Sequence, residues 1–143
     1  MEIKYFEEIL TLILGGPSGS ESIGLTPVDL IVIETEGDIE PVDTLKTAGR
    51  GATSLGMNVR THSFDDALAH PAVMSRLIGA DALCKTCRDC SELTNCGGGY
   101  IPHRFRKTTG FLNTSIYCED LKHLFGVIRS RIHGCIVASG VRG

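Results

Sequence analysis

Apolar residues recur at intervals of three and four along the start of the chain, at Ile3, Phe6, Ile9, Leu10, Ile13 and Leu14. This spacing predicts an amphipathic helix over residues 2–14, ended by Gly15 and Gly16. The following residues, through position 24, are rich in Gly and Ser and include Pro17. They predict a linker or surface loop, with a domain boundary after residue 24.

The pattern then changes to one that is typical of strands. A short apolar, β-branched run covers residues 30–33, Glu36 and Gly37 supply a turn, and residues 39–42 return. We therefore expect an antiparallel hairpin over residues 28–43, with Pro41 at an edge or unpaired position. Residues 44–60 contain three glycines and no periodicity, which predicts irregular structure.

Helical signals return in the second half of the chain. Ser63 is an expected N-cap for a helical turn over residues 64–69, and Pro71 for the first position of a short helix through residue 78. Residues 84–96 are expected to form turns and short helical pieces. Glu119 and Asp120 open a last helix with one apolar face, and Gly134 is expected to end it.

These elements predict an α+β fold: a small irregular domain with a β-hairpin, an iron–sulfur cluster-binding loop region and flanking helices. A chain of 143 residues has room for one core of ordinary size. We expect three parts, with a helix and linker at 1–24, a cluster domain at 25–133 and a flexible tail at 134–143.

Composition excludes several classes of function. Charged residues make up 22 % of the chain and the net charge is −3, so a polyanion-binding surface and nucleic-acid binding are not expected. Charged residues interrupt the first apolar stretch, which therefore predicts neither a signal peptide nor a membrane span. Six cysteines in a chain without an export signal point to a cytoplasmic protein with metal-bound thiols.

Five of the six cysteines lie between residues 84 and 118, namely Cys84, Cys87, Cys90, Cys96 and Cys118. Thiolates are soft ligands that favour zinc, copper(I) or iron–sulfur clusters. Three glycines follow Cys96, and residues without a Cβ let the main chain approach a bulky centre and direct N–H groups at its sulfurs. This region is the candidate metal centre.

Three interpretations of these thiols compete. Cys87, Cys90, Cys96 and Cys118 would close a [4Fe–4S] site. Using Cys84 in place of Cys118 gives a ferredoxin-like run, but its last gap is five residues instead of three and no proline follows. The same thiols could hold structural zinc, although the usual second CxxC knuckle is missing. The spacing favours an iron–sulfur centre over zinc and over unligated cysteines.

The stretch from residue 87 to residue 121 resembles the SPASM domain, the C-terminal cluster-bearing extension of radical S-adenosylmethionine (SAM) enzymes that mature peptides. The resemblance is carried by CxxCx5CGGG from Cys87, by PHRF at 102–105 and by GFLNTSIYCEDL at 110–121. Upstream, VIETEGDIEPVDTLK and SFDDALAHP resemble the C-terminal third of maturases that form side-chain cyclophane crosslinks.

The resemblance implies that Cys87, Cys90, Cys96 and Cys118 ligate one auxiliary [4Fe–4S] cluster. Cys84 lies outside the pattern and is at most a substitute ligand. Gly97, Gly98, Gly99, His103 and Arg104 are implied to contact the cluster or a peptide. SPASM domains with two clusters carry further cysteines at positions that Val42 and Tyr100 occupy here, and none precedes Cys84, which implies a single cluster.

Other polar groups have two interpretations each. The basic residues at 103–107, including Arg106 and Lys107, either neutralise an anionic cluster and bind acidic peptide groups or form a solvated loop. The acidic residues on the hairpin are expected to form a solvated face. Tyr100 and Tyr117 are expected to pack around the cluster, and Cys135 to be an unpaired thiol of the tail.

The radical SAM motif CxxxCxxC is absent, and a barrel that could hold it needs roughly 200 residues. We expect no catalytic residue and no S-adenosylmethionine binding in this chain, which looks like the C-terminal part of a maturase: a split gene product, a relic or an excised piece. Implied partners are a ribosomally made substrate peptide and a separate radical SAM core protein, with electron transfer or substrate positioning as the role. The alternative is a stand-alone peptide-recognition module, zinc-stabilised or metal-free.

Overall fold

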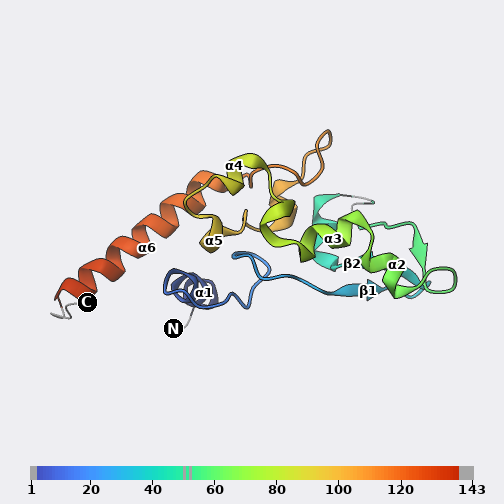
Figure 1. Cartoon of the computed structure of the whole chain (residues 1–143), viewed down its shortest axis with the longest axis horizontal. Coiled ribbons are helices and arrows are strands. Elements are labelled where there is room, and N and C mark those ends of the chain that lie inside the picture. The colour runs from blue at the N-terminus through green and yellow to red at the C-terminus, as the bar shows by residue number, and fades with distance from the viewer. Residues whose placement is uncertain (1–2, 50, 52, 139–143) are drawn as a thin grey trace.

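The computed structural model describes residues 3–49, 51 and 53–138. Two groups of elements lie along the long axis of the molecule (Figure 1). A small sheet with helices α2 and α3 forms one end, and helices α1, α5 and α6 form the other. The α+β class predicted from the sequence is confirmed.

The sheet has three antiparallel strands in the order β1-β2-β3: β1 (Ile31–Ile33), β2 (Asp38–Pro41) and β3 (Met57–Asn58). Strands β1 and β2 form the predicted hairpin, with Ile31 opposite Pro41 and Ile33 opposite Ile39. Gly37 has φ +88° in the connecting turn, a value that favours glycine. Strand β3 pairs only with Asp38 and Ile39, so one side of Pro41 stays unpaired, as expected.

The prediction of irregular structure over residues 44–60 was wrong in part. A 3-10 helix, η1 (Asp43–Ala48), follows β2 and buries Leu45, and the two-residue strand β3 joins the sheet. The Asn58 side chain fixes this strand by donating hydrogen bonds to the Glu36 carbonyl (3.1 Å) and the Asp38 carboxylate (2.9 Å). Neither element has a local periodicity, because each is stabilised by contacts with distant residues.

Helices α2 (Phe64–Leu68) and α3 (Pro71–Leu77) begin as predicted. Ser63 accepts a hydrogen bond from the Asp66 N–H while the Asp66 carboxylate accepts one from the Ser63 N–H, which completes a capping box. Pro71 is the first residue of α3. Ala67 and Val73 pack with Ile39 and Leu55 in a first hydrophobic core.

A second core joins α1 (Lys4–Ile13) to α6 (Cys118–Ala138) through Ile9 and Phe125, which are fully buried. Ile23, 1 % exposed, completes this core. Residues 15–24 do form a loop, but the loop packs on α1, since the Gly19 N–H donates to the Glu8 carboxylate at 2.9 Å. Cys96 packs against the same core, which therefore supports the cysteine region.

The predicted end of the last helix at Gly134 was wrong, because α6 continues to Ala138. A glycine inside a helix costs only about 1 kcal/mol relative to alanine, which its neighbours can offset. Residues 134–138 of the predicted tail are thus helical, and residues 139–143 lie outside the described part. Figure 1 shows the C-terminal half of α6 extending past the other elements. No helix within the described residues has the length and apolarity needed to cross a membrane.

Candidate metal centre

Short helices place the first three cysteines of the motif. Cys87 lies inside α4 (Lys85–Arg88), Cys90 lies in the turn that follows, and Cys96 ends α5 (Leu93–Cys96). Gly97 caps α5 with φ +59°, which turns the chain back at once. Cys118 is the first residue of α6, so a residue 22 positions later in sequence completes the group.

These four cysteines line one cavity of about 370 Å³. Cys84 is not among the described residues that line it. Cys84 instead precedes α4, where its thiol hydrogen-bonds with that of Cys87. Cys135 is exposed on the distal part of α6. The structure thus separates the six free thiols into a set of four, one neighbour and one remote residue.

Backbone N–H groups point at two of the sulfurs. The Glu92 N–H donates to Cys90 Sγ at 3.4 Å. The N–H groups of Gly98 and, more weakly, Gly99 hydrogen-bond to the thiol of Cys96 and favour its thiolate, although burial raises the pKa of Cys96 more strongly. Such donors stabilise charge on a ligand sulfur, and in iron–sulfur proteins they adjust the reduction potential.

Burial raises the pKa of three of these thiols, those of Cys87, Cys96 and Cys118. Burial, the hydrogen bond with Cys84 and the neighbouring cysteines raise the pKa of Cys87 to about 12. Burial also raises the pKa of Cys118. Four thiolates so close together require a positively charged centre, so metal binding here would release protons.

The sulfur spacing distinguishes between metals. Tetrahedral zinc with Zn–S bonds of about 2.3 Å brings every pair of sulfurs to about 3.8 Å. Among the described residues, no three cysteine sulfurs lie within 4.8 Å of one another. The cavity also exceeds what one ion needs and falls in the size range of cofactor sites, about 300–1,000 Å³. The cysteine sulfurs described here are therefore spaced more widely than a single tetrahedral zinc ion requires.

Arg104 supplies a buried positive charge close to Cys84, Cys87 and Cys96. Its side chain belongs to the 3-10 helix η3 (Ile101–Arg104), is 5 % exposed, and has a buried Nε with no hydrogen-bond partner in the described part of the chain. Burial lowers the pKa of Arg104, and nearby Cys87, Cys84 and Cys96 oppose that effect. A buried guanidinium with an unpartnered Nε close to Cys84, Cys87 and Cys96 fits an anionic metal–thiolate centre.

Of the other predicted contact residues, only Gly98 is among the described residues that line the cavity. A Cβ on Gly98 would lie 3.2 Å from Arg104 Nη1. A Cβ on Gly97 would overlap the Gly24 carbonyl, and one on Gly99 would meet Leu121 at 3.0 Å. His103 does not line this cavity; its ring packs between Tyr100 and Tyr117, at centroid distances of 5.1 and 4.8 Å.

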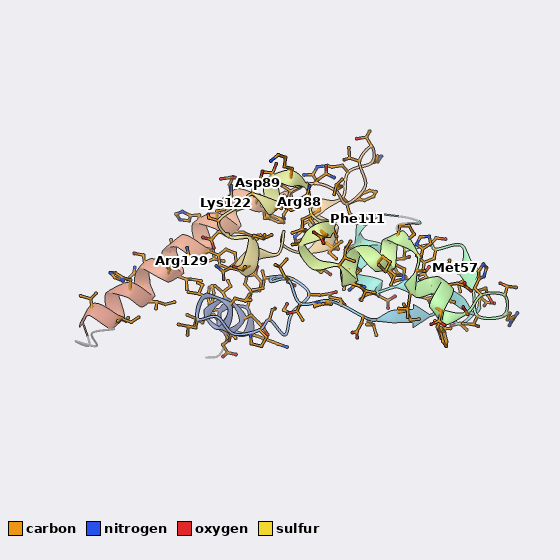
Figure 2. The ribbon with its side chains drawn as sticks, viewed as in Figure 1. Met57, Arg88, Asp89, Phe111, Lys122 and Arg129 are labelled. Atoms are coloured by element: carbon orange, nitrogen blue, oxygen red, sulfur yellow. The ribbon has the colours of Figure 1, made fainter. Side chains whose placement is uncertain are left out.

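Sequence reasoning missed two features of the site. Lys122 lines the cavity one helical turn after Cys118, a spacing of four that the sequence already contained. Glu92 accepts two hydrogen bonds of 2.8 Å from Arg129 and so connects the cysteine loop to α6. Figure 2 shows Lys122 on α6 with Arg129 further along the same helix, and Asp89 lines the same cavity as Lys122. The Glu92–Arg129 pair, 37 residues apart, had no sequence signal.

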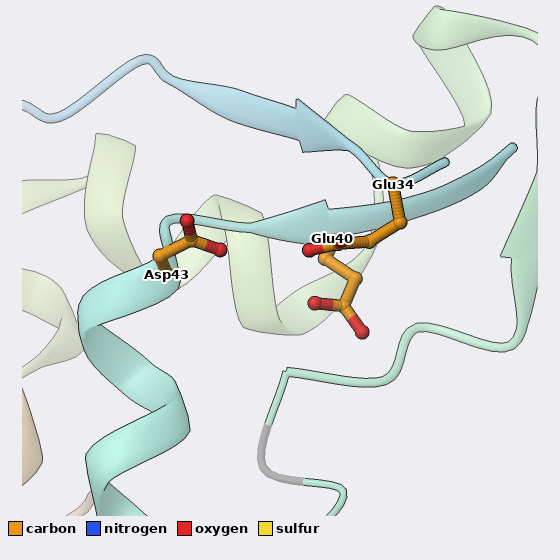
Figure 3. Close-up of side chains that lie close together, drawn as sticks. All are labelled: Glu34, Glu40 and Asp43. Atoms are coloured by element: carbon orange, nitrogen blue, oxygen red, sulfur yellow. The ribbon is translucent and has the colours of Figure 1, made fainter. Parts of the chain in front are cut away.

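The acidic residues at the hairpin already share a lysine as their ion-pair partner. Glu34, Glu40 and Asp43 bring their carboxylates together (Figure 3). Lys46 Nζ contacts all three, at 3.3 Å from Glu40 and 2.9 Å from Asp43 as well as Glu34. These contacts, led by those with Glu34 and Asp43, raise the pKa of Lys46 above its usual value. One lysine therefore already offsets part of the negative charge of the group.

The comparisons with known proteins give a structural match. No protein-family model matches the chain, and no curated protein matches it. Native anSMEcpe with bound AdoMet, a radical SAM peptide maturase, superposes on 99 % of this chain with a TM-score of 0.68 and 22 % identity. The same protein with bound AdoMet and the Kp18Cys peptide gives 0.67 at 22 % identity over 99 % of this chain.

The chain spans 37 % of the length of both structures. At this level of identity the match concerns the fold, and the expected resemblance to a SPASM-like portion of such an enzyme is confirmed at that level. The chain therefore has the fold of a SPASM domain.

Proposed function

We propose that this chain is the auxiliary-cluster part of a radical SAM peptide maturase and holds one [4Fe–4S] cluster. Cys87, Cys90, Cys96 and Cys118 are the proposed ligands. The observation that carries the proposal is their convergence on one cavity, which Cys84 does not line. A bound cluster would supply a one-electron reservoir.

The residues around the cavity are suited to hold such a centre. Arg104 contributes a buried positive charge, and Lys122 adds a second at the exposed side. The N–H groups of Gly98 and Glu92 contact the ligand sulfurs. These two cations and two N–H groups would stabilise a site that holds four thiolates and a net negative charge.

The proposed role within the maturase is electron transfer or positioning of a substrate peptide. The anSMEcpe structures include complexes with the Kp18Cys and Cp18Cys peptides, and those proteins are longer than this chain. A radical SAM core protein that carries CxxxCxxC is the proposed partner, because that motif is absent from this sequence. Hydrogen abstraction would then take place outside this chain.

Metal analysis of anaerobically purified protein tests the proposal. We expect about four irons and four sulfides per chain for one [4Fe–4S] cluster. Stoichiometric zinc without sulfide would contradict the cluster and support the zinc-stabilised alternative.

A matched pair of cysteine variants tests the ligand set. Cys118→Ser removes a cavity-lining thiol and should abolish stable cluster binding, whereas Cys84→Ser removes a thiol that does not line the cavity and should retain it. Iron and sulfide content with the visible absorbance of the cluster would be measured for both. Loss in Cys84→Ser with retention in Cys118→Ser would replace this set with the ferredoxin-like one.

A further inference from the structure

A second cavity, of about 340 Å³, lies beside the cysteine region. Its lining comes from α1, from Ser22 in the loop after α1, from the segment after the glycines, and from the start of α6 with the residue before it. All three tyrosines of the chain, Tyr5, Tyr100 and Tyr117, are among the residues that line it. The fold thus gathers from three separate segments every tyrosine that the sequence contains.

The aromatic groups are held in a fixed arrangement. His103 packs edge-to-face against Tyr100 (81° between planes) and against Tyr117 (75°). Tyr5 is anchored from the other side, because it packs against the core of Ile9, Ile23 and Phe125. Side chains that are already ordered lose little entropy when a ligand enters.

Asp120 gives this cavity its electrostatic character. It is the one carboxylate among the described lining residues, which include no lysine or arginine. Its neighbour Glu119 pairs with Lys122 at 2.9 Å, whereas Asp120 has no ion-pair partner within the described residues. Asp120 and Tyr117 are exposed, so solvent and ligands can reach the cavity.

Aromatic rings and a carboxylate together recognise organic cations. Tyrosine rings attract ammonium and guanidinium groups through the negative potential of their faces, and an unpaired carboxylate adds direct attraction. The cavity volume is in the range of small-ligand sites and can accept one long side chain. An acidic or purely apolar side chain would leave Asp120 unpaired.

We propose that the cavity formed by Tyr5, Tyr100, Tyr117, His103 and Asp120 binds a lysine or arginine side chain of the substrate peptide. This inference rests on the proposed function for the existence of a peptide substrate, but not on the cluster. Tyr100 follows the three glycines and Tyr117 precedes Cys118, so a peptide held here lies next to the metal centre.

Binding of short model peptides to the full chain tests the inference. The probes are acetylated, amidated pentapeptides with glycine on both sides of a central lysine, arginine, norleucine or glutamate. Norleucine has the lysine side chain without its amine, so it isolates the charge. We expect the lysine and arginine peptides to bind at least tenfold tighter than the norleucine peptide in NMR titrations, with shifts at the tyrosine ring signals.

Three variants locate the effect. Asp120→Asn and Tyr117→Leu should each weaken lysine-peptide binding about fivefold or more, whereas Glu119→Gln, which removes the adjacent carboxylate, should leave it unchanged. Iron and sulfide content, measured on every sample, reports the proposed cluster separately from peptide binding. A cluster-free protein that still prefers the lysine peptide would contradict the proposed cluster and support the cation site.

Several results would overturn the cation site. Equal affinity for the lysine and norleucine peptides would show an apolar pocket, and tighter binding of the glutamate peptide would assign recognition to the basic residues instead. Equal losses in Glu119→Gln and Asp120→Asn would show a long-range charge effect. The absence of saturable binding by every probe would also overturn it.

Discussion

Replacing Arg104 by methionine should have opposite effects on the metal-free and cluster-loaded proteins. In the metal-free protein Arg104 is 5 % exposed, its Nε has no hydrogen-bond partner in the described structure, and burial raises the pKa of the adjacent Cys87 thiol to about 12. A buried donor without a hydrogen-bond partner lowers the free energy of unfolding by about 1–3 kcal/mol. Methionine retains most of the packing volume without this cost.

We therefore expect Arg104→Met to raise the free energy of unfolding of the metal-free protein by about 1–2 kcal/mol. This corresponds to an increase of about 3–7 °C in melting temperature for a chain of this size. In the loaded protein the same change removes a buried counter-charge. The loss of one partner of a buried ion pair costs about 3–5 kcal/mol, which Lys122 at the exposed side reduces to about 2–3 kcal/mol.

A loss of about 2–3 kcal/mol corresponds to roughly 30- to 150-fold weaker retention of the cluster. The assay is chelator challenge followed by visible absorbance, together with thermal unfolding of both forms. Arg104→Lys keeps the charge and should retain more cluster than Arg104→Met, and Arg88→Met removes an exposed charge on the neighbouring helix as a control. Equal destabilisation of the loaded and metal-free proteins by Arg104→Met would refute this electrostatic role and leave only packing.

Three further changes test the fold around the site. Gly97→Ala should destabilise the protein, because φ +59° is unfavourable for alanine and its Cβ would overlap the Gly24 carbonyl. The change should release residues 15–24 from the cysteine loop. Unchanged hydrogen-exchange protection of residues 15–24 would show that this contact is unimportant. Gly134→Ala should stabilise α6 by about 0.5–1 kcal/mol, since nothing lies within 4 Å of the added Cβ. A loss of helical circular dichroism would instead mean that the helix ends at Gly134. Hydrogen bonds from the side chain and then the backbone of Ser63 lower the pKa of Asp66. The ionised Asp66 carboxylate therefore contributes to stability above its unfolded pKa of about 4, and this contribution is lost as the pH falls through the lower folded pKa. Asp66→Asn should thus lower stability at pH 7 with a smaller difference near pH 3 in denaturant unfolding, and a difference independent of pH would contradict the capping role.

Local signals predicted the helices and hairpin because their determinants lie within a few residues. The spacing of Ile3, Phe6 and Ile9 predicted α1, and Ser63 and Pro71 predicted the starts of α2 and α3. Strand β3 and helix η1 had no such signal, because Met57 and Leu45 are ordered by residues far away in sequence. The misplaced end of α6 has a different cause, since Gly134 is a weak local signal that the surrounding helix overrides.

The cysteines illustrate the same division within the site. Sequence spacing left Cys84 and Cys118 as competing ligands, and the resemblance to SPASM domains favoured Cys118. The structure supports that choice by geometry, since Cys118 lines the cavity with Cys87, Cys90 and Cys96. The partners of this set, such as the Arg129 that pairs with Glu92, follow only from the packing of α6 against the cysteine loop.

The sequence by itself determined the soft donor atoms, the glycines that allow close approach to them, and the boundaries of most local elements. These depend on residue chemistry and on spacings of a few residues. Only the tertiary structure decided which four thiols share a cavity, that Arg104 is buried beside them, and that three tyrosines meet next to Asp120. These juxtapositions join segments more than a hundred residues apart in sequence. They arise because α1, the cysteine loop and α6 bury their apolar faces against one another.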